Sequence, residues 1–197
     1  MLIFFDTEFT DIGLDPKLIS IGLISESEKE FYAELSDTYE PSACQPFVRD
    51  VVLPHLQGKD ALMTMDELTL RLGNWIESFD QPVQLVTDSP SWDWPWIEKL
   101  FHLPGTWPQN LGAHPVPLYQ IDDPDKLKQY IDWTFETQGS RLRRHHTLDD
   151  AIAHQQAWLM CKVNGDESWL HEPAMQERLA RADQWMRENP VKDQVQK

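Results

Sequence analysis

Two acidic residues separated by one position, Asp6 and Glu8, are the first groups in the sequence that could do chemistry. They lie in the otherwise apolar segment 4–9, whose composition predicts a β-strand. Side chains two residues apart in a strand point to the same face, so the two carboxylates project to one side. They repel each other unless a positive group lies between them, and divalent cations prefer such oxygen ligands. The pair indicates a metal site, with a turn-forming Asp6 and a solvated Glu8 as the alternative.

Two further acids follow a second apolar strand, predicted over 83–87. Asp88 comes directly at its end, and Asp93 lies five residues later at the start of a predicted helix. Asp93 is also explained as an acid that the helix dipole favours, with Ser91 as the cap. Asp93 is the preferred functional acid here, and Asp88 remains the competing candidate.

The segment His145-His146-Thr147-Leu148-Asp149-Asp150 combines imidazoles with carboxylates. Thr147 and Asp150 resemble a capping box, which predicts that a helix starts here, with His145 in the preceding loop. An imidazole titrates near neutral pH and can accept a proton from an attacking water. His145 is the candidate general base and His146 a second one. The alternative is a capped helix after a solvated basic loop.

The remaining periodicity predicts the elements that must position these groups. We expect strands over 4–9, 18–24, 30–35, 83–87 and 116–121, of which the first three form an antiparallel meander. We expect helices over 46–56, 65–79, 94–101 and 125–137, one from about 148, and a last one over 172–189. The fold class is therefore α/β, a mixed five-stranded sheet with helices on both faces. The strand ends of such a sheet bring side chains to one edge, where four carboxylates suit two Mg²⁺ or Mn²⁺ ions.

Composition limits the classes of function. The 197 residues fit one domain, and a hydrophobic content of 41% is typical of a globular protein. The net charge of −16 argues against a broad duplex-binding surface but leaves room for a small pocket that binds a few nucleotides through metal ions. The sequence has no apolar run of membrane-spanning length, and its N-terminus lacks the basic region of a signal peptide. With two cysteines at no metal or redox spacing, we expect a cytoplasmic protein.

Together these motifs resemble those of the DEDDh branch of the DnaQ-like 3′–5′ exonucleases, most closely the small single-domain bacterial 3′–5′ exoribonucleases. Phe5-Asp6-Thr7-Glu8-Phe9 matches the first motif, and His145 and Asp150 match the third. The middle motif departs from the usual His-Asn-Ala-x-Phe-Asp, since it is Asp88-Ser89-Pro90-Ser91-Trp92-Asp93 here, but Asp93 keeps the place of the aspartate.

The resemblance implies a ribonuclease H-like fold, here as a single exonuclease domain over 1–197 with a helical extension at about 172–189. It implies that Asp6, Glu8, Asp93 and Asp150 hold two Mg²⁺ or Mn²⁺ ions, with Asp6 touching both, and that His145 is the general base. Thr7 and Phe9 are the predicted substrate-binding residues, because an aromatic ring such as Phe9 can stack on a terminal base.

The function expected from this resemblance is hydrolysis of single-stranded nucleic acid from its 3′ end to nucleoside 5′-monophosphates. RNA is favoured over DNA, and a homodimer is expected because exonucleases of this family are often dimers. The alternatives are a DNA-directed 3′–5′ exonuclease, and a catalytically silent module of the same fold that binds nucleic acid or protein.

Overall fold

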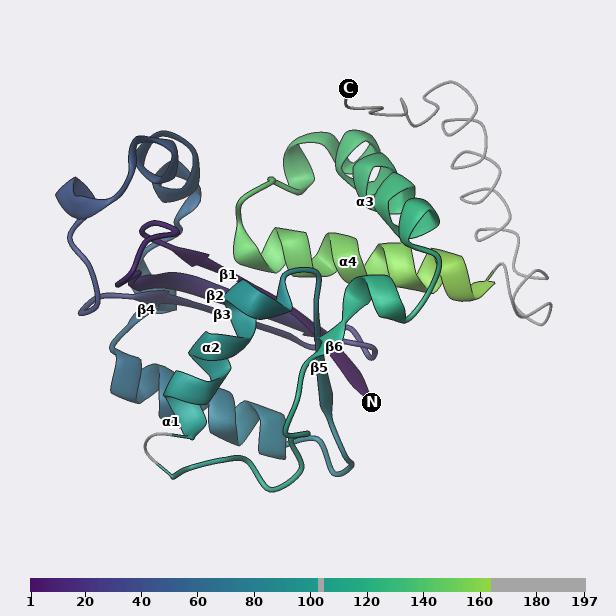
Figure 1. Cartoon of the computed structure of the whole chain (residues 1–197), viewed down its shortest axis with the longest axis horizontal. Coiled ribbons are helices and arrows are strands. Elements are labelled where there is room, and N and C mark those ends of the chain that lie inside the picture. Colours follow the sequence, from purple (N-terminus) through teal and green to yellow (C-terminus); the bar gives the residue numbers. More distant parts are fainter. Residues whose placement is uncertain (103–104, 164–197) are drawn as a thin grey trace.

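A computed structural model of the chain places a mixed β-sheet between two pairs of α-helices (Figure 1). The structure describes residues 1–102 and 105–163, so the predicted helix over 172–189 lies outside the described residues. Within those two ranges, no helix combines the length and the apolar character that a membrane span requires.

The sheet is built around β1 (Leu2–Phe9), which carries Asp6 and Glu8. β1 pairs antiparallel with β2 (Leu18–Ser25), which pairs antiparallel with β3 (Glu30–Leu35), so the predicted meander is confirmed. On its other side β1 pairs in parallel with β5 (Gln84–Thr87). Two-residue strands, β4 (Leu62–Met63) and β6 (Val116–Pro117), complete the order β4-β3-β2-β1-β5-β6. β1 is therefore a central strand with a neighbour on each side.

The prediction of five strands is wrong by one edge strand, because the sheet has six. β4 was missed because a two-residue segment is too short to show a strand periodicity. The strand predicted over 116–121 ends after two residues and continues as the 3-10 helix Leu118–Gln120. Pro117 lacks the N–H that a longer ladder would need. Both differences concern the edges, so the strands that carry the acids are unaffected.

Four helices cover the sheet: α1 (Met65–Glu77), α2 (Pro90–Phe101), α3 (Pro124–Gln138) and α4 (Thr147–Val163). Thr64 and Glu67 cap α1 with a reciprocal capping box. α2 begins four residues earlier than predicted, because Pro90 suits the first turn of a helix. The segment predicted as a helix over 46–56 is helical over 46–55 but irregular, because two α-helical residues are followed by a π-helix, Val48–Val52, and a 3-10 helix, Leu53–His55. Pro54 explains this break, since proline removes a donor and restricts the residue before it. Further 3-10 helices span Pro41–Ala43, Lys59–Ala61 and Gly139–Arg141.

Each face of the sheet has its own apolar core, which confirms that helices cover both faces. Ile3 and Phe5 of β1 face α1 and α2. Phe4, between them in the strand, faces α3 and α4. Burial of a side chain of this size contributes about 1.5–3 kcal/mol, so the alternation fixes which way β1 faces. Asp6 and Glu8 share the parity of Phe4 and therefore project toward α4.

Gly22 allows α4 to begin directly against the sheet. It lies opposite Asp6 in the ladder, and a Cβ added there would collide with the backbone of Thr147 and Leu148. We expect Gly22→Ala to destabilise the fold by about 1–3 kcal/mol, the usual cost of overpacking a core. Gly73→Ala is the matched control, since its Cβ would meet a ring carbon of Phe101 at an ordinary 3.5 Å. The measurement is urea denaturation, and equal midpoints for both variants would contradict this explanation.

Candidate functional site

A cavity of about 330 Å³ opens where the ends of β1 and β5 meet α3 and the first turns of α4. Five carboxylates line it, those of Asp6, Glu8, Asp88, Asp132 and Asp150. The rest of the wall comprises two imidazoles, two cationic side chains and three other residues: His145, His154, Lys128, Arg144, Ser89, Tyr119 and Ile131. Asp6 and Asp150, 144 positions apart in the sequence, thus meet at one edge of the sheet, as the strand ends predicted.

The carboxylates form two groups that share Asp6. One oxygen each from Asp6, Glu8 and Asp150 lie within 4.8 Å of one another, and so do oxygens from Asp6, Asp88 and Asp93. Both groups contain only carboxylate oxygen, the ligand that hard divalent cations prefer. The arrangement can hold two cations, one in each group, with Asp6 between them.

The carboxylates of this cluster are buried and repel one another, so a nearby positive charge would stabilise their ionised forms. Burial raises the pKa of Asp6 well above its usual range, and the charges of Asp93, Asp150, Glu8 and Asp88 raise it further. Burial is also the main reason why the pKa of Asp93 and that of Asp150 each rise to about 7. A cation between these groups would favour their ionised forms. The residues present therefore fit a divalent metal site.

Asp93 and Asp88 occupy different positions in this cluster. Asp93 is buried, and each of its oxygens accepts a hydrogen bond, one from the hydroxyl of Thr7 at 2.5 Å and one from that of Thr87. Asp88 lies in the wall of the cavity. The substrate contact predicted for Thr7 stays a prediction, and in the structure its hydroxyl holds Asp93.

The two adjacent histidines have different surroundings. The side chain of His145 is 45% exposed at the cavity, and its Nδ1 lies 3.5 Å from Oε1 of Glu8, which raises the pKa of the imidazole. His146 is buried, its Nε2 lies 3.1 Å from Nε2 of Gln57, and its ring stacks on Tyr32. Only His145 can reach a molecule in the cavity, which favours it over His146 as a base.

His146 instead organises the start of α4. The predicted capping box of Thr147 is wrong, because the Thr147 hydroxyl is buried without a hydrogen-bond partner among the described residues. The Nδ1 of His146 accepts from the backbone N–H of Asp149 at 3.4 Å, and its carbonyl accepts from that of Asp150. Arg143 stabilises the same turn, because its Nε lies 2.8 Å from Oδ2 of Asp149. His145 between them has a φ of 64°, a left-handed conformation that costs about 1–3 kcal/mol and that this surrounding structure maintains.

His154 is the cavity residue that the sequence reasoning missed. It follows Asp150 by four positions on α4, a spacing that places both on one helix face and that could have revealed it. Its side chain is buried, and burial lowers the pKa of the imidazole. Its Nε2 lies 3.7 Å from Oδ2 of Asp88.

An aromatic surface lies beside the end of β1. Phe9 stacks on Trp92 with ring centroids 6.0 Å apart, and Trp92 is 46% exposed. Both line a second cavity of about 290 Å³, together with Trp96 and Lys99. The nearby Trp94 and Trp96, by contrast, are buried in the core. Phe9 and Trp92 thus offer an accessible stacking surface.

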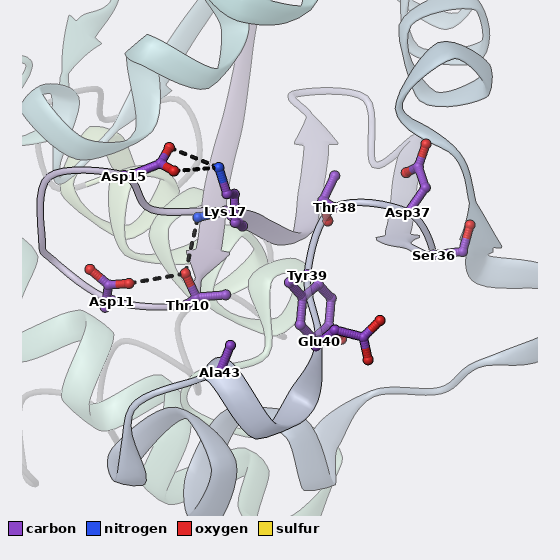
Figure 2. Close-up of a pocket in the computed structure, with 10 residues that line it drawn as sticks. All are labelled: Thr10, Asp11, Asp15, Lys17, Ser36, Asp37, Thr38, Tyr39, Glu40 and Ala43. Carbon is purple, nitrogen blue, oxygen red and sulfur yellow. Dashed lines mark hydrogen bonds and ion pairs between the residues drawn. The ribbon is translucent and has the colours of Figure 1, made fainter.

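Figure 2 shows a third cavity, of about 380 Å³, whose three aspartates have partners close by in the structure. The ammonium of Lys17 contacts Asp15 at 2.7 Å, and the hydroxyl of Thr10 donates to Asp11. Asp37 accepts from the backbone N–H of Met65. This cavity lacks the imidazoles and the close carboxylate groups of the cavity around Asp6.

The fold and the acid-lined edge define the class: this is a ribonuclease H-like fold of the kind found in exonucleases. Exonuclease I (apo) is similar with a TM-score of 0.50 at 11% identity, covering 91% of this chain and 44% of that chain. Another exonuclease I structure has a TM-score of 0.49 at 12% identity, with coverages of 91% and 43%. No protein-family model matches the chain.

Two relatives found by sequence have names that state an activity. The 3′–5′ exoribonucleases Rv2179c and MT2234.1, from two strains of Mycobacterium tuberculosis, are each 43% identical over 56 residues, 28% of this chain. The match spans about a third of the length of these curated relatives, 33% of each. With the exonuclease fold, this match confirms the resemblance to the DnaQ-like exonucleases.

Proposed function

We propose that the protein is a metal-dependent 3′–5′ exonuclease that hydrolyses single-stranded nucleic acid to nucleoside 5′-monophosphates. The observation that carries this proposal is the pair of carboxylate groups that share Asp6, with the half-exposed His145 beside them. A module that only binds nucleic acid has no need for a buried cluster of mutually repelling acids, because such a cluster costs stability unless cations neutralise it.

Asp6, Glu8, Asp93 and Asp150 are the proposed metal ligands. Asp6 would touch both cations, Glu8 and Asp150 would serve one, and Asp93 the other. Two Mg²⁺ or Mn²⁺ ions, when bound, supply charge stabilisation for the attacking and leaving oxygens of a phosphodiester. The chain's part is to hold its carboxylates rigidly, which the central strand and the first turn of α4 do for Asp6, Glu8 and Asp150.

His145 is the proposed general base. Because its Nδ1 faces Glu8, its Nε2 is the nitrogen available to take a proton from the attacking water. Its exposure of 45% lets the imidazole pass that proton on to solvent after the reaction. The hydrogen bonds of His146 and Arg143 on either side keep the ring at the mouth of the cavity.

Phe9 and Trp92 are the proposed contacts for the bases of the substrate. Thr7 contributes to the site by donating a hydrogen bond to Asp93. Base–aromatic stacking contributes about 1–3 kcal/mol per base and tolerates any sequence. A substrate held by stacking and metal ions suits a chain whose net charge is −16. The names of the mycobacterial relatives favour RNA over DNA as the substrate.

The test is an assay of the purified protein on matched RNA and DNA single strands labelled at either end. With Mn²⁺ or Mg²⁺ we expect the 3′ label to be released first as a nucleoside 5′-monophosphate, and EDTA to stop the reaction. Release from the 5′ end, or undiminished activity in EDTA, would overturn the proposal. Faster turnover of DNA than of RNA would leave the reaction standing and reverse the preferred substrate.

A further inference from the structure

The cavity contains a second acid–imidazole pair, which has no role in the proposed reaction. Asp88 and His154 lie side by side in its wall, with Nε2 3.7 Å from Oδ2. The pair resembles Glu8 and His145, whose atoms are 3.5 Å apart, but its imidazole is buried whereas that of His145 is half-exposed.

His154 is an unusual residue for packing alone. Its side chain is 6% exposed, and its Nδ1 has no hydrogen-bond partner within the described ranges. A buried polar atom without a partner costs about 1–3 kcal/mol, a cost that an apolar side chain at this position would avoid. Since its other nitrogen points at Asp88, the imidazole is explained by an action on that carboxylate.

The carboxylate of Asp88 has fewer protein partners than that of Asp93. Each oxygen of Asp93 accepts one hydrogen bond, from Thr7 or Thr87, and keeps one lone pair for a cation, whereas no protein hydrogen bond reaches the carboxylate of Asp88 from the described part of the chain. Its side chain is 28% exposed, so a cavity ligand can contact it. It nevertheless lies within 4.8 Å of the Asp6 and Asp93 oxygens. Without Asp88, the second carboxylate group would consist of Asp6 and Asp93 only.

We propose that Asp88 is an additional carboxylate ligand of the second divalent cation and that His154 is the positioning residue that orients it. The proposal rests on the proposed function, because it concerns the cation held by Asp6 and Asp93. It assigns the imidazole a role common around metal sites, where a partner outside the ligand shell fixes a ligand's orientation.

The test is Mn²⁺ binding to the full chain without nucleic acid, measured by isothermal titration calorimetry and by electron paramagnetic resonance. The wild type should bind two ions. Asp88→Asn should lose the weaker of the two or bind it at least about tenfold more weakly, and His154→Leu should weaken it about 10–100-fold. His154→Gln should retain near wild-type affinity, because its amide nitrogen can replace Nε2.

Asp80→Asn is the matched control, since it removes one carboxylate charge from an exposed position on another part of the surface. If Asp88→Asn binds both ions as tightly as this control, the inference is overturned and the proposed function stands. If the wild type itself binds no Mn²⁺, the proposed function fails as well. Should His154→Leu not fold, Asp88→Asn decides the ligand, and His154→Phe, which keeps an aromatic ring without the nitrogens, decides the orientation. Wild-type Mn²⁺ affinity in His154→Phe would overturn the positioning role, whereas weaker binding in His154→Phe than in His154→Gln would support it.

Discussion

Asp6→Asn is expected to lower kcat/KM by at least about a thousandfold. Asp6 is the one acid common to both carboxylate groups, so its replacement weakens two cations at once. Metal ions at such sites supply several kcal/mol of transition-state stabilisation, and each 1.4 kcal/mol corresponds to about tenfold in rate. The measurement is release of labelled mononucleotide at saturating Mn²⁺, with Asp80→Asn as the control for a lost surface charge.

The same substitution should have the opposite effect on the stability of the metal-free protein. Burial raises the pKa of Asp6 in the folded state above its unfolded value, and the charges of Asp93, Asp150, Glu8 and Asp88 raise it further. An acid with a raised folded pKa costs stability once the pH exceeds the unfolded value of about 4, so this cost is present at pH 7–8. Asparagine has no charge and removes this cost. In EDTA, the melting temperature of Asp6→Asn should therefore exceed that of the wild type by about 2–4 °C for each kcal/mol of stability gained.

Addition of Mn²⁺ then distinguishes the two proteins. A ligand that binds only the folded state stabilises it, so Mn²⁺ should raise the melting temperature of the wild type clearly and that of Asp6→Asn little. A variant that melts below the wild type in EDTA would show that Asp6 supports the fold in some other way. A wild type indifferent to Mn²⁺ would remove the basis of the metal site.

His145→Ala is expected to lower kcat by about 10²–10⁴-fold, the usual contribution of a general base. KM should change little, and Mn²⁺ binding should persist, because the carboxylates remain in place. The fold should remain intact, since the side chain of His145 is half-exposed and alanine, like histidine, adopts a φ of 64° only under strain. Turnover, KM and calorimetric Mn²⁺ binding together separate the loss of a base from the loss of a metal.

His146→Ala is the informative comparison for this prediction. His146 is buried against Tyr32 and caps the first turn of α4, so its loss should chiefly lower the unfolding free energy. Any fall in activity should follow the fraction of folded protein. If His146→Ala abolished turnover in a stable protein while His145→Ala did not, the assignment of the base would be reversed.

Much of the fold follows from local patterns. Alternation along β1 puts Asp6 and Glu8 on one face and Phe5 on the other, and the structure has that arrangement. Helix periodicity located α1, α3 and α4 to within a few residues. The helix over 46–56 is less regular and the strand over 116–121 shorter than predicted, because a proline in each interrupts the pattern that the apolar residues suggest.

Spacing along the chain was enough to predict that two carboxylates end a central strand and that His145 and Asp150 flank a helix start. No spacing indicated that Asp88 faces the cavity while two hydroxyls enclose Asp93, or that His154 lies against Asp88. These differences depend on atoms from β1, β5 and α4 that are far apart in sequence. Their distances are set by the packing of helices on both faces of the sheet, which no local spacing encodes.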